Sequence, residues 1–310
     1  MALPANYGGV VPPLCTPFTL NGEIDADSLK QLVEYQINGG VAGIFALGST
    51  SEVGAMNDAQ RHEVLDLTVK AVNGRVPVLA GVITMSTGST IDYARQAEEL
   101  GADAVVAVGP YYIRPSQEEV KHHFRLLQDA TSLPIMAYHV PFNVQTVITT
   151  ETLEELAAEG VISGVKDSSG DDASFRNIVA AMEPYPNISV FTGAELTVDY
   201  AIFGGADGVV PGLGNVDPAG YRRLYDAAKA GDWDTARAEQ ARLTALFAIV
   251  RQATPGRLGF TSSALGGFKT ALRELGVIET NVMATPMMPM NDEEAGRVRE
   301  VLVEAGLSPR

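Results

Sequence analysis

The sequence predicts an α/β protein built as a (β/α)8 TIM barrel with a C-terminal helical extension. Short apolar segments rich in β-branched residues alternate with amphipathic segments of helical period, and eight such short segments occur before residue 232. Because these segments are apolar on both faces, they indicate a parallel sheet covered by helices, and a closed barrel is the simplest such arrangement. The length of 310 residues also suits this fold, since such barrels typically need about 250 residues.

The predicted strands and helices have recognisable ends. Asp25, Asn57 and Ser116 each precede an amphipathic segment, and Glu119 completes a capping box with Ser116. Beyond residue 231 the strands cease and three helical segments follow. We therefore expect a barrel over residues 1–231 and a helical extension over residues 232–310, which is a candidate surface for packing between subunits. The eight strands are expected near residues 10–18, 43–48, 76–82, 104–109, 134–140, 161–166, 188–192 and 208–212.

The charge balance argues against two classes of partner. A formal net charge of −16 and a pI near 4.6 disfavour binding to nucleic acid or to an anionic membrane surface, since both reward clustered lysine and arginine. No apolar run is long enough to cross a bilayer, and residues 1–10 lack the basic and apolar regions of a signal peptide. We therefore expect a cytoplasmic protein. A small anionic substrate remains compatible with this charge, because backbone N–H groups and hydroxyls can hold a carboxylate.

The residues that usually bind metals are too scattered to form a metal site. Cys15 is the only cysteine, which excludes an internal disulfide, and it lies in an apolar segment typical of a protein core. His122 and His123 are adjacent, whereas His62 and His139 lie in separate segments with no partner at ligand spacing. We expect no bound metal.

Lys166 is the candidate nucleophile, because it alone among the lysines lies in an apolar strand. Burying an unpaired ammonium is costly, which favours the neutral amine that attacks carbonyl groups. The alternative is a lysine whose charge is paired with Asp167 or with a glutamate. Alternation along a strand places Lys166 and Asp167 on opposite faces, which weakens this alternative. The other lysines fall in polar or amphipathic helical segments or open a C-terminal helix: Lys30, Lys70, Lys121, Lys229 and Lys269.

Polar residues at the carboxyl ends of the predicted strands are the other candidates, because active sites of such barrels lie at that end. Ser49 and Thr50 could present hydroxyls and, with the following helix, N–H groups to a carboxylate. A Ser-Thr pair before a helix is also an ordinary N-cap. Tyr138 lies among apolar residues, where a tyrosine is most often part of the core. On these residues alone, both alternatives stay open.

Four motifs occur in a characteristic order and spacing. They are Gly-Ser-Thr-Ser-Glu at 48–52, Pro-Tyr-Tyr at 110–112, Tyr-His-Val-Pro at 138–141 and Gly-Val-Lys-Asp-Ser-Ser-Gly at 164–170. Together they resemble the dihydrodipicolinate synthase and N-acetylneuraminate lyase family of pyruvate-dependent class I aldolases. The resemblance extends over essentially the whole chain, including Gly-Ala-Asp-Gly-Val-Val at 205–210.

The resemblance implies roles for individual residues. Lys166 would form a Schiff base with pyruvate, and Tyr138 would carry a proton between the imine and the substrate oxygen. Ser49 and Thr50 would bind the pyruvate carboxylate, with Ser49 also linked to Tyr138. The backbone of Val210 would line the pyruvate pocket.

The resemblance also has consequences for assembly and cofactors. Tyr112 is similar to the tyrosine that family members insert into the site of a neighbouring subunit, which implies a homotetramer made of two tight dimers. An iminium on Lys166 acts as an electron sink, so the C3–C4 bond can form or break through an enamine. The resemblance therefore implies neither a metal nor an organic cofactor.

The residues on the aldehyde side depart from both main branches of the family. Synthases that condense pyruvate with aspartate semialdehyde resemble one another in an arginine where this chain has Asn143, and a neutral amide binds a carboxylate less strongly than a guanidinium. Sialic acid lyases are similar to this chain at Glu195 but carry an aspartate at the position of Ala194 and a serine at that of Gly212. Ser51 replaces the usual glycine.

We therefore expect a lyase that cleaves a 2-keto acid to pyruvate and an aldehyde. The 2-keto acid would be a 2-keto-3-deoxy sugar acid or a sialic-acid-like compound, with Asn143 and Glu195 in the substrate site. The first alternative is 4-hydroxy-tetrahydrodipicolinate synthase, which uses pyruvate and aspartate semialdehyde. A further alternative is a catalytically silent pyruvate-binding regulator, and the intact pair of Lys166 and Tyr138 argues against it.

Overall fold

The computed structural model describes residues 7–310, and its centre is an eight-stranded sheet in which every neighbouring pair of strands is parallel. The strand order is β1-β8-β7-β6-β5-β4-β3-β2, so strands that follow one another in sequence lie side by side. The strands are β1 Gly9–Val10, β2 Ile44–Ala46, β3 Val78–Gly81, β4 Ala104–Val108, β5 Ile135–His139, β6 Gly164–Asp167, β7 Ser189–Thr192 and β8 Gly208–Val209.

Backbone hydrogen bonds close the barrel between β2 and the segment that follows β1. Ala42 donates to the carbonyl of Val10 across 2.8 Å. Farther along, Phe45 donates to Pro12 across 3.0 Å and accepts from Leu14 across 2.8 Å. The predicted (β/α)8 barrel is thereby confirmed.

The first predicted strand, 10–18, is longer than the observed one. Only Gly9–Val10 forms a regular ladder, with β8. Pro12, Pro13 and Pro17 have no backbone N–H to donate, so the segment cannot continue as a regular ladder strand. It continues between β8 and β2 with isolated hydrogen bonds instead.

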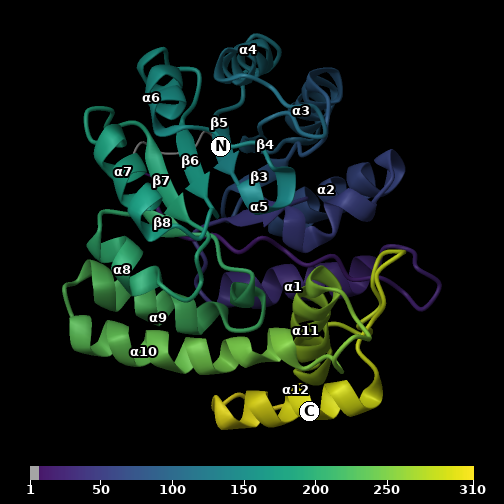
Figure 1. The fold of residues 1–310 in the computed structure, drawn as a ribbon. Helices are drawn as coiled ribbons and strands as arrows, with labels where there is room; N and C mark the ends of the chain where they lie inside the picture. Colours follow the sequence, from purple (N-terminus) through teal and green to yellow (C-terminus); the bar gives the residue numbers. More distant parts are fainter. Residues whose placement is uncertain (1–6) are drawn as a thin grey trace.

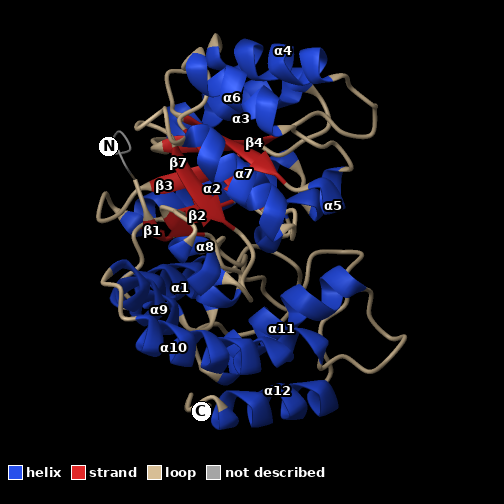
Figure 2. Cartoon of the chain, turned by 60° about the vertical axis from the view of Figure 1, so that its left-hand side comes forward, coloured by secondary structure: helices blue, strands red, loops and turns tan. Residues whose placement is uncertain are grey.

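Helices enclose the sheet on its outer side (Figure 1; Figure 2). Each strand is followed by a covering helix, and after β5 a short helix, α5, precedes the covering helix α6. The predicted N-caps Asp25, Asn57 and Ser116 all cap helices, and the capping box of Ser116 with Glu119 is present. These helices are α1 Ala26–Asn38, α2 Asp58–Val72, α3 Thr87–Leu100, α4 Gln117–Gln128, α5 Pro141–Val144, α6 Thr150–Ala158, α7 Asp172–Met182, α8 Val198–Phe203 and α9 Pro218–Lys229.

The three helices predicted after residue 231 are confirmed as α10 Trp233–Leu246, α11 Phe260–Glu274 and α12 Asp292–Glu304. They stack on one side of the barrel, where α10 packs against α9 and α12 packs against both α10 and α11 (Figure 1). That residues 232–310 form a separate unit stays a prediction.

The main core lies between the sheet and the helices and includes the fully buried Ile44, Val105 and Val165. Within residues 7–310, no helix combines the length and the apolar character needed to span a bilayer. The expectation about a signal peptide concerns the N-terminus, of which residues 1–6 lie outside the described residues.

Candidate active site

The register of β5 and β6 brings Tyr138 and Lys166 together. Their Cα atoms are direct partners across the two strands, so both side chains project from the same face of the sheet. Lys166 Nζ lies 3.9 Å from the centroid of the Tyr138 ring and 4.9 Å from that of Phe45 in β2. Lys166 and Tyr138 are only 3% and 4% exposed. The candidate nucleophile is thus buried against two aromatic rings.

Asp167 does not neutralise Lys166. It projects from the opposite face, where its Oδ1 lies 3.2 Å from His139 Nδ1 and its Oδ2 accepts a hydrogen bond from Ser169 Oγ across 2.9 Å. No ion pair among residues 7–310 involves Lys166. The alternative in which Asp167 pairs the charge of Lys166 is therefore wrong, because strand alternation separates the two side chains.

The surroundings of Tyr138 lower the pKa of its phenol. Burial would raise its pKa, but the charge of Lys166 and hydrogen bonds with Ser168, Ser49 and Lys166 hold the pKa of Tyr138 below its usual value. A phenol with a lowered pKa exchanges protons more readily near neutral pH. Sequence reasoning missed Ser168, although its position two residues after Lys166 places it on the same face of β6.

The turn that carries Ser49 and Thr50 is anchored by Ser51. This 3-10 turn, Ser49–Ser51, directly follows β2. Ser51 Oγ donates to the carbonyl of Leu14 across 2.6 Å, and Thr16 Oγ1 donates to the carbonyl of Ser51 across 3.0 Å. Ser51 therefore fastens the turn to the segment that follows β1, which explains a residue that the sequence left without a role.

A buried ion pair fixes the end of the same turn. Lys269 Nζ in α11 donates to Glu52 Oε1 across 2.7 Å, and the backbone N–H of Ala284 donates to Glu52 Oε2 across 2.6 Å. Both charged side chains are fully buried. Sequence reasoning treated Lys269 as the first residue of a helix and missed this pair. The signal was the small and apolar sequence around it, from Leu265 to Leu272.

Glu195 lies after β7 and is partly buried. Its Oε1 accepts the backbone N–H of Leu213 across 2.6 Å. Burial raises its pKa to about 7, against the opposing effects of this hydrogen bond and of the charge of Lys166. A Cβ atom at Gly212 would lie 2.8 Å from the ring of Phe268, so the serine of the sialic acid lyases has no room here.

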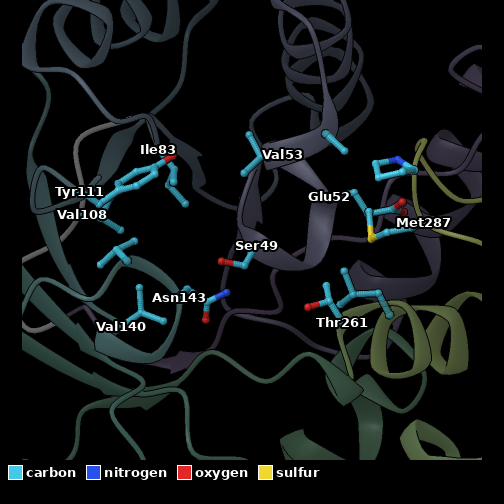
Figure 3. Close-up of a pocket in the computed structure, with 15 residues that line it drawn as sticks. Ser49, Glu52, Val53, Ile83, Val108, Tyr111, Val140, Asn143, Thr261 and Met287 are labelled. Atoms are coloured by element: carbon cyan, nitrogen blue, oxygen red, sulfur yellow. The ribbon is translucent and has the colours of Figure 1, made fainter. Parts of the chain in front are cut away.

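A cavity of ≈ 360 Å³ opens beside Ser49 (Figure 3). Ser49 lies between one wall, formed by the end of β4, the segments that follow β3, β4 and β5, and α5, and a second wall that includes α11 and the segment before α12. The C-terminal extension therefore contributes to the site. The residues that line the cavity are Ser49, Glu52, Val53, Gly54, Ala55, Ile83, Val108, Tyr111, Val140, Asn143, Val144, Thr261, Leu265, Pro286 and Met287.

The other predicted site residues, which are Asn143, Thr50, Val210 and Tyr112, lie in four different surroundings. Asn143 lines the cavity from α5. Thr50 is buried in the turn beside Ser49. Val210 follows β8, and its backbone N–H already donates to the carbonyl of Thr192 across 2.8 Å. Tyr112 is 92% exposed and has a left-handed φ of 74°, so a single chain does not bring its ring into the buried site.

The structure also bears on metal binding and on the reactivity of the Cys15 thiol. In the part of the chain that the structure describes, no three His, Cys, Asp or Glu side chains come close enough to hold a metal ion. Cys15 is buried, and burial raises the pKa of its thiol to about 12, as expected for a core cysteine rather than a nucleophile.

Comparison with known proteins gives consistent matches over the whole chain. A family model described as the dihydrodipicolinate synthetase family matches residues 6–305. The 4-hydroxy-tetrahydrodipicolinate synthase of Phenylobacterium zucineum is 35% identical over 304 residues, which cover 97% of this chain and 98% of that protein. The structure of dihydrodipicolinate synthase from Bacteroides thetaiotaomicron has a TM-score of 0.91 and 31% identity, covering 98% of this chain and 100% of that one. A prophage protein of the dihydrodipicolinic acid synthase family from E. coli K12, solved in complex with pyruvate, has a TM-score of 0.91 and 25% identity, covering 97% and 99%.

Proposed function

Because the chain belongs to the dihydrodipicolinate synthetase family, whose enzymes make or break carbon–carbon bonds as class I aldolases do, we propose that it acts on pyruvate through a Schiff base on Lys166. The observation that carries this proposal is the position of Lys166 Nζ, which is buried and lies 3.9 Å from the centroid of the Tyr138 ring. Among the described residues it has no ion-pair partner. Such an amine is available for attack on a carbonyl group.

The proposed reaction needs only these side chains and water. The amine of Lys166 attacks C2 of pyruvate, and the carbonyl oxygen takes up protons and leaves as water, which gives an iminium. Loss of a proton from C3 converts the iminium to an enamine, and C3 then attacks the carbonyl carbon of an aldehyde. The aldehyde oxygen takes up a proton, and water releases the product and regenerates the amine. Cleavage of a 2-keto acid follows the same steps in reverse.

Tyr138 suits the proton transfers of this scheme. Its lowered pKa and its contact with Lys166 support a role as proton donor and acceptor for the proposed imine. Ser49, which hydrogen-bonds Tyr138, and Thr50 would hold the pyruvate carboxylate, with the backbone of Val210 along the pocket. Tyr112 would enter from a second copy of the chain within a homotetramer.

The relatives bear on the direction of the reaction. The curated relative reported above is named a synthase, and this favours the condensation alternative over the cleavage of a sugar acid that the sequence led us to expect. Glu195 remains a candidate contact for the second substrate. Asn143, which replaces the arginine of synthases, favours an aldehyde other than aspartate semialdehyde.

Reduction by borohydride in the presence of pyruvate tests the Schiff base. We expect a covalent pyruvate adduct on the peptide that carries Lys166, detected by mass spectrometry, and none in Lys166→Ala. Tyr138→Phe should keep much of the adduct but lose about 100-fold or more in turnover, because general acid and base catalysis contributes that much. The exposed Lys30→Ala serves as the control and should behave as the wild type.

An adduct on another lysine, or no adduct with a folded protein, would exclude the proposed role of Lys166. Normal turnover in Tyr138→Phe would exclude Tyr138 as the proton carrier. An adduct without any turnover on aldehydes or 2-keto acids would support the regulator alternative.

A further inference from the structure

The cavity beside Ser49 adjoins the proposed pyruvate site, and its lining is mainly apolar. Ser49 joins this cavity to the buried site, because its hydroxyl helps to lower the pKa of Tyr138, and its side chain also borders the cavity (Figure 3). Aliphatic groups cover both walls. They come from Val53, Ile83, Val108, Val140, Val144, Leu265 and Met287.

No cationic side chain is available in this cavity to neutralise an anionic substrate group. None of the described lining residues is a lysine or an arginine. Arg61 lies behind the wall, where its Nη1 donates to the carbonyl of Ile83 and its Nη2 to that of Val53, each across 3.0 Å. Its charged group is therefore committed to the backbone.

The one charged lining residue is an anion that is already satisfied. Glu52 uses Oε1 for Lys269 and Oε2 for the backbone N–H of Ala284. A substrate carboxylate in this cavity would lose its hydration without gaining a counter-ion, and burial of an unpaired charge is strongly unfavourable. A polyhydroxylated group would likewise leave several hydroxyls without partners.

Two exposed aromatic rings extend the apolar surface at the rim. Phe142 precedes Asn143 in α5, and Phe260 precedes Thr261 in α11. Their rings meet edge to face with centroids 5.9 Å apart, although they are 77% and 76% exposed. Exposed aromatic side chains beside a cavity are typical of a surface that receives an apolar ligand.

We infer that the aldehyde side of the substrate carries an uncharged, apolar group, of which a phenyl ring is the simplest case. This inference rests on the proposed function, since it concerns the second substrate of the same Schiff base. The few polar groups of the lining, on Tyr111, Asn143 and Thr261, would orient the aldehyde oxygen. The apolar walls would take the rest of the molecule.

Condensation of pyruvate with a matched pair of aldehydes tests the inference. Benzaldehyde and 4-carboxybenzaldehyde differ by one carboxylate, and aspartate semialdehyde and glyceraldehyde provide a charged and a polyhydroxylated comparison. We expect kcat/KM for benzaldehyde to exceed that for each of the other three by about tenfold or more. Asn143→Arg should reverse the order within the matched pair, because it adds a cation to the lining.

Rim variants separate this cavity from the pyruvate site. Phe142→Ala and Phe260→Ala should each lower kcat/KM for benzaldehyde by about fivefold while pyruvate trapping stays unchanged. The control is Phe203→Ala, which removes an exposed ring that stacks edge to face on Trp233 with centroids 5.1 Å apart, on other helices. It should change neither measurement.

The outcomes distinguish the two proposals. If borohydride traps pyruvate on Lys166 but a charged or polyhydroxylated aldehyde reacts best, or none of the four reacts, this inference is wrong and the Schiff base stands. If pyruvate is not trapped, both fail.

Discussion

Glu195 carries a carboxyl group whose pKa is changed by its surroundings, including Lys166. Its carboxyl group is partly buried, and this raises its pKa to about 7, although Leu213 donates a backbone N–H to it and Lys166 lies close enough to oppose the rise. At neutral pH it therefore exists as a mixture of acid and carboxylate. The folded chain holds a proton there that the unfolded chain would release.

Replacement of Glu195 should change how stability depends on pH. Between about pH 4.5 and 7 the folded state binds the extra proton, so the free energy of unfolding falls as the pH rises through this window. Glu195→Gln keeps an acceptor for Leu213 but cannot ionise. We expect it to be more stable than the wild type at pH 8, on the order of 1–3 kcal/mol, and equal to it at pH 4.

Denaturant unfolding at the two pH values measures this difference. The exposed Glu63→Gln is the control and should show no such pH dependence. A stability difference of Glu195→Gln that is the same at both pH values would show that ionisation is not involved.

Sequence patterns identified some of these side chains and not others. Lys166 could be predicted because a charged residue inside an apolar strand is conspicuous, and alternation correctly separated it from Asp167. Ser51 could not be assigned, because it acts on the carbonyl of Leu14 in a distant segment, and Ser168, although it shares a face with Lys166, could not be linked to Tyr138. Only the register of the folded sheet brings those atoms together.

At the scale of elements, α11 and the turn after β2 form one unit through the pair of Glu52 and Lys269. We expect Lys269→Met to lower the free energy of unfolding by about 3–5 kcal/mol, because it leaves the Glu52 carboxylate buried without a counter-ion. The double variant Glu52→Gln/Lys269→Met should regain much of this loss. Thermal or denaturant unfolding measures the cycle.

An exposed ion pair of the same length provides the control for this cycle. Lys70 Nζ lies 2.7 Å from Asp66 Oδ2 on the surface of α2. Lys70→Met should cost less than about 1 kcal/mol. An equally small effect of Lys269→Met would mean that Glu52 finds other partners, and the turn would then not depend on α11.

The elements also show where local patterns are insufficient. Caps and helical periods predicted α1, α2 and α4 well, since those signals lie within each segment. The first strand was predicted too long because apolar composition outweighed its prolines. Burial of the middle of α11 depends on contacts with distant segments, which no local period reveals.

At the scale of the molecule, apolar side chains near the site remain exposed in the single chain. Tyr112, Ile113, Phe142 and Val147 are all exposed, and they lie on the loops and helix that follow β4 and β5. A second copy of the chain is the expected cover for Tyr112. If its ring completes a neighbouring site, activity requires residues from two chains.

Mixing two inactive variants tests this expectation. Tyr112→Ala should lose about 10-fold or more in turnover, and Lys166→Ala should have none. After subunit exchange, hybrid dimers contain one site with both residues, so about a quarter of the wild-type activity should return. Sedimentation measures the assembly of each sample. Hybrid assemblies without recovered activity would show that Tyr112 acts within its own chain or not at all.

The pair of Glu52 and Lys269 joins residues 217 positions apart, and this has a consequence for a chain that is still being made on the ribosome. All eight strands and Lys166 are synthesised before residue 269. The contact that fixes the end of the turn carrying Ser49 nevertheless forms only after α11 has emerged. A nascent or prematurely ended product that stops before residue 269 can therefore contain all eight strands and still lack the contact that fixes this turn beside the proposed pyruvate site.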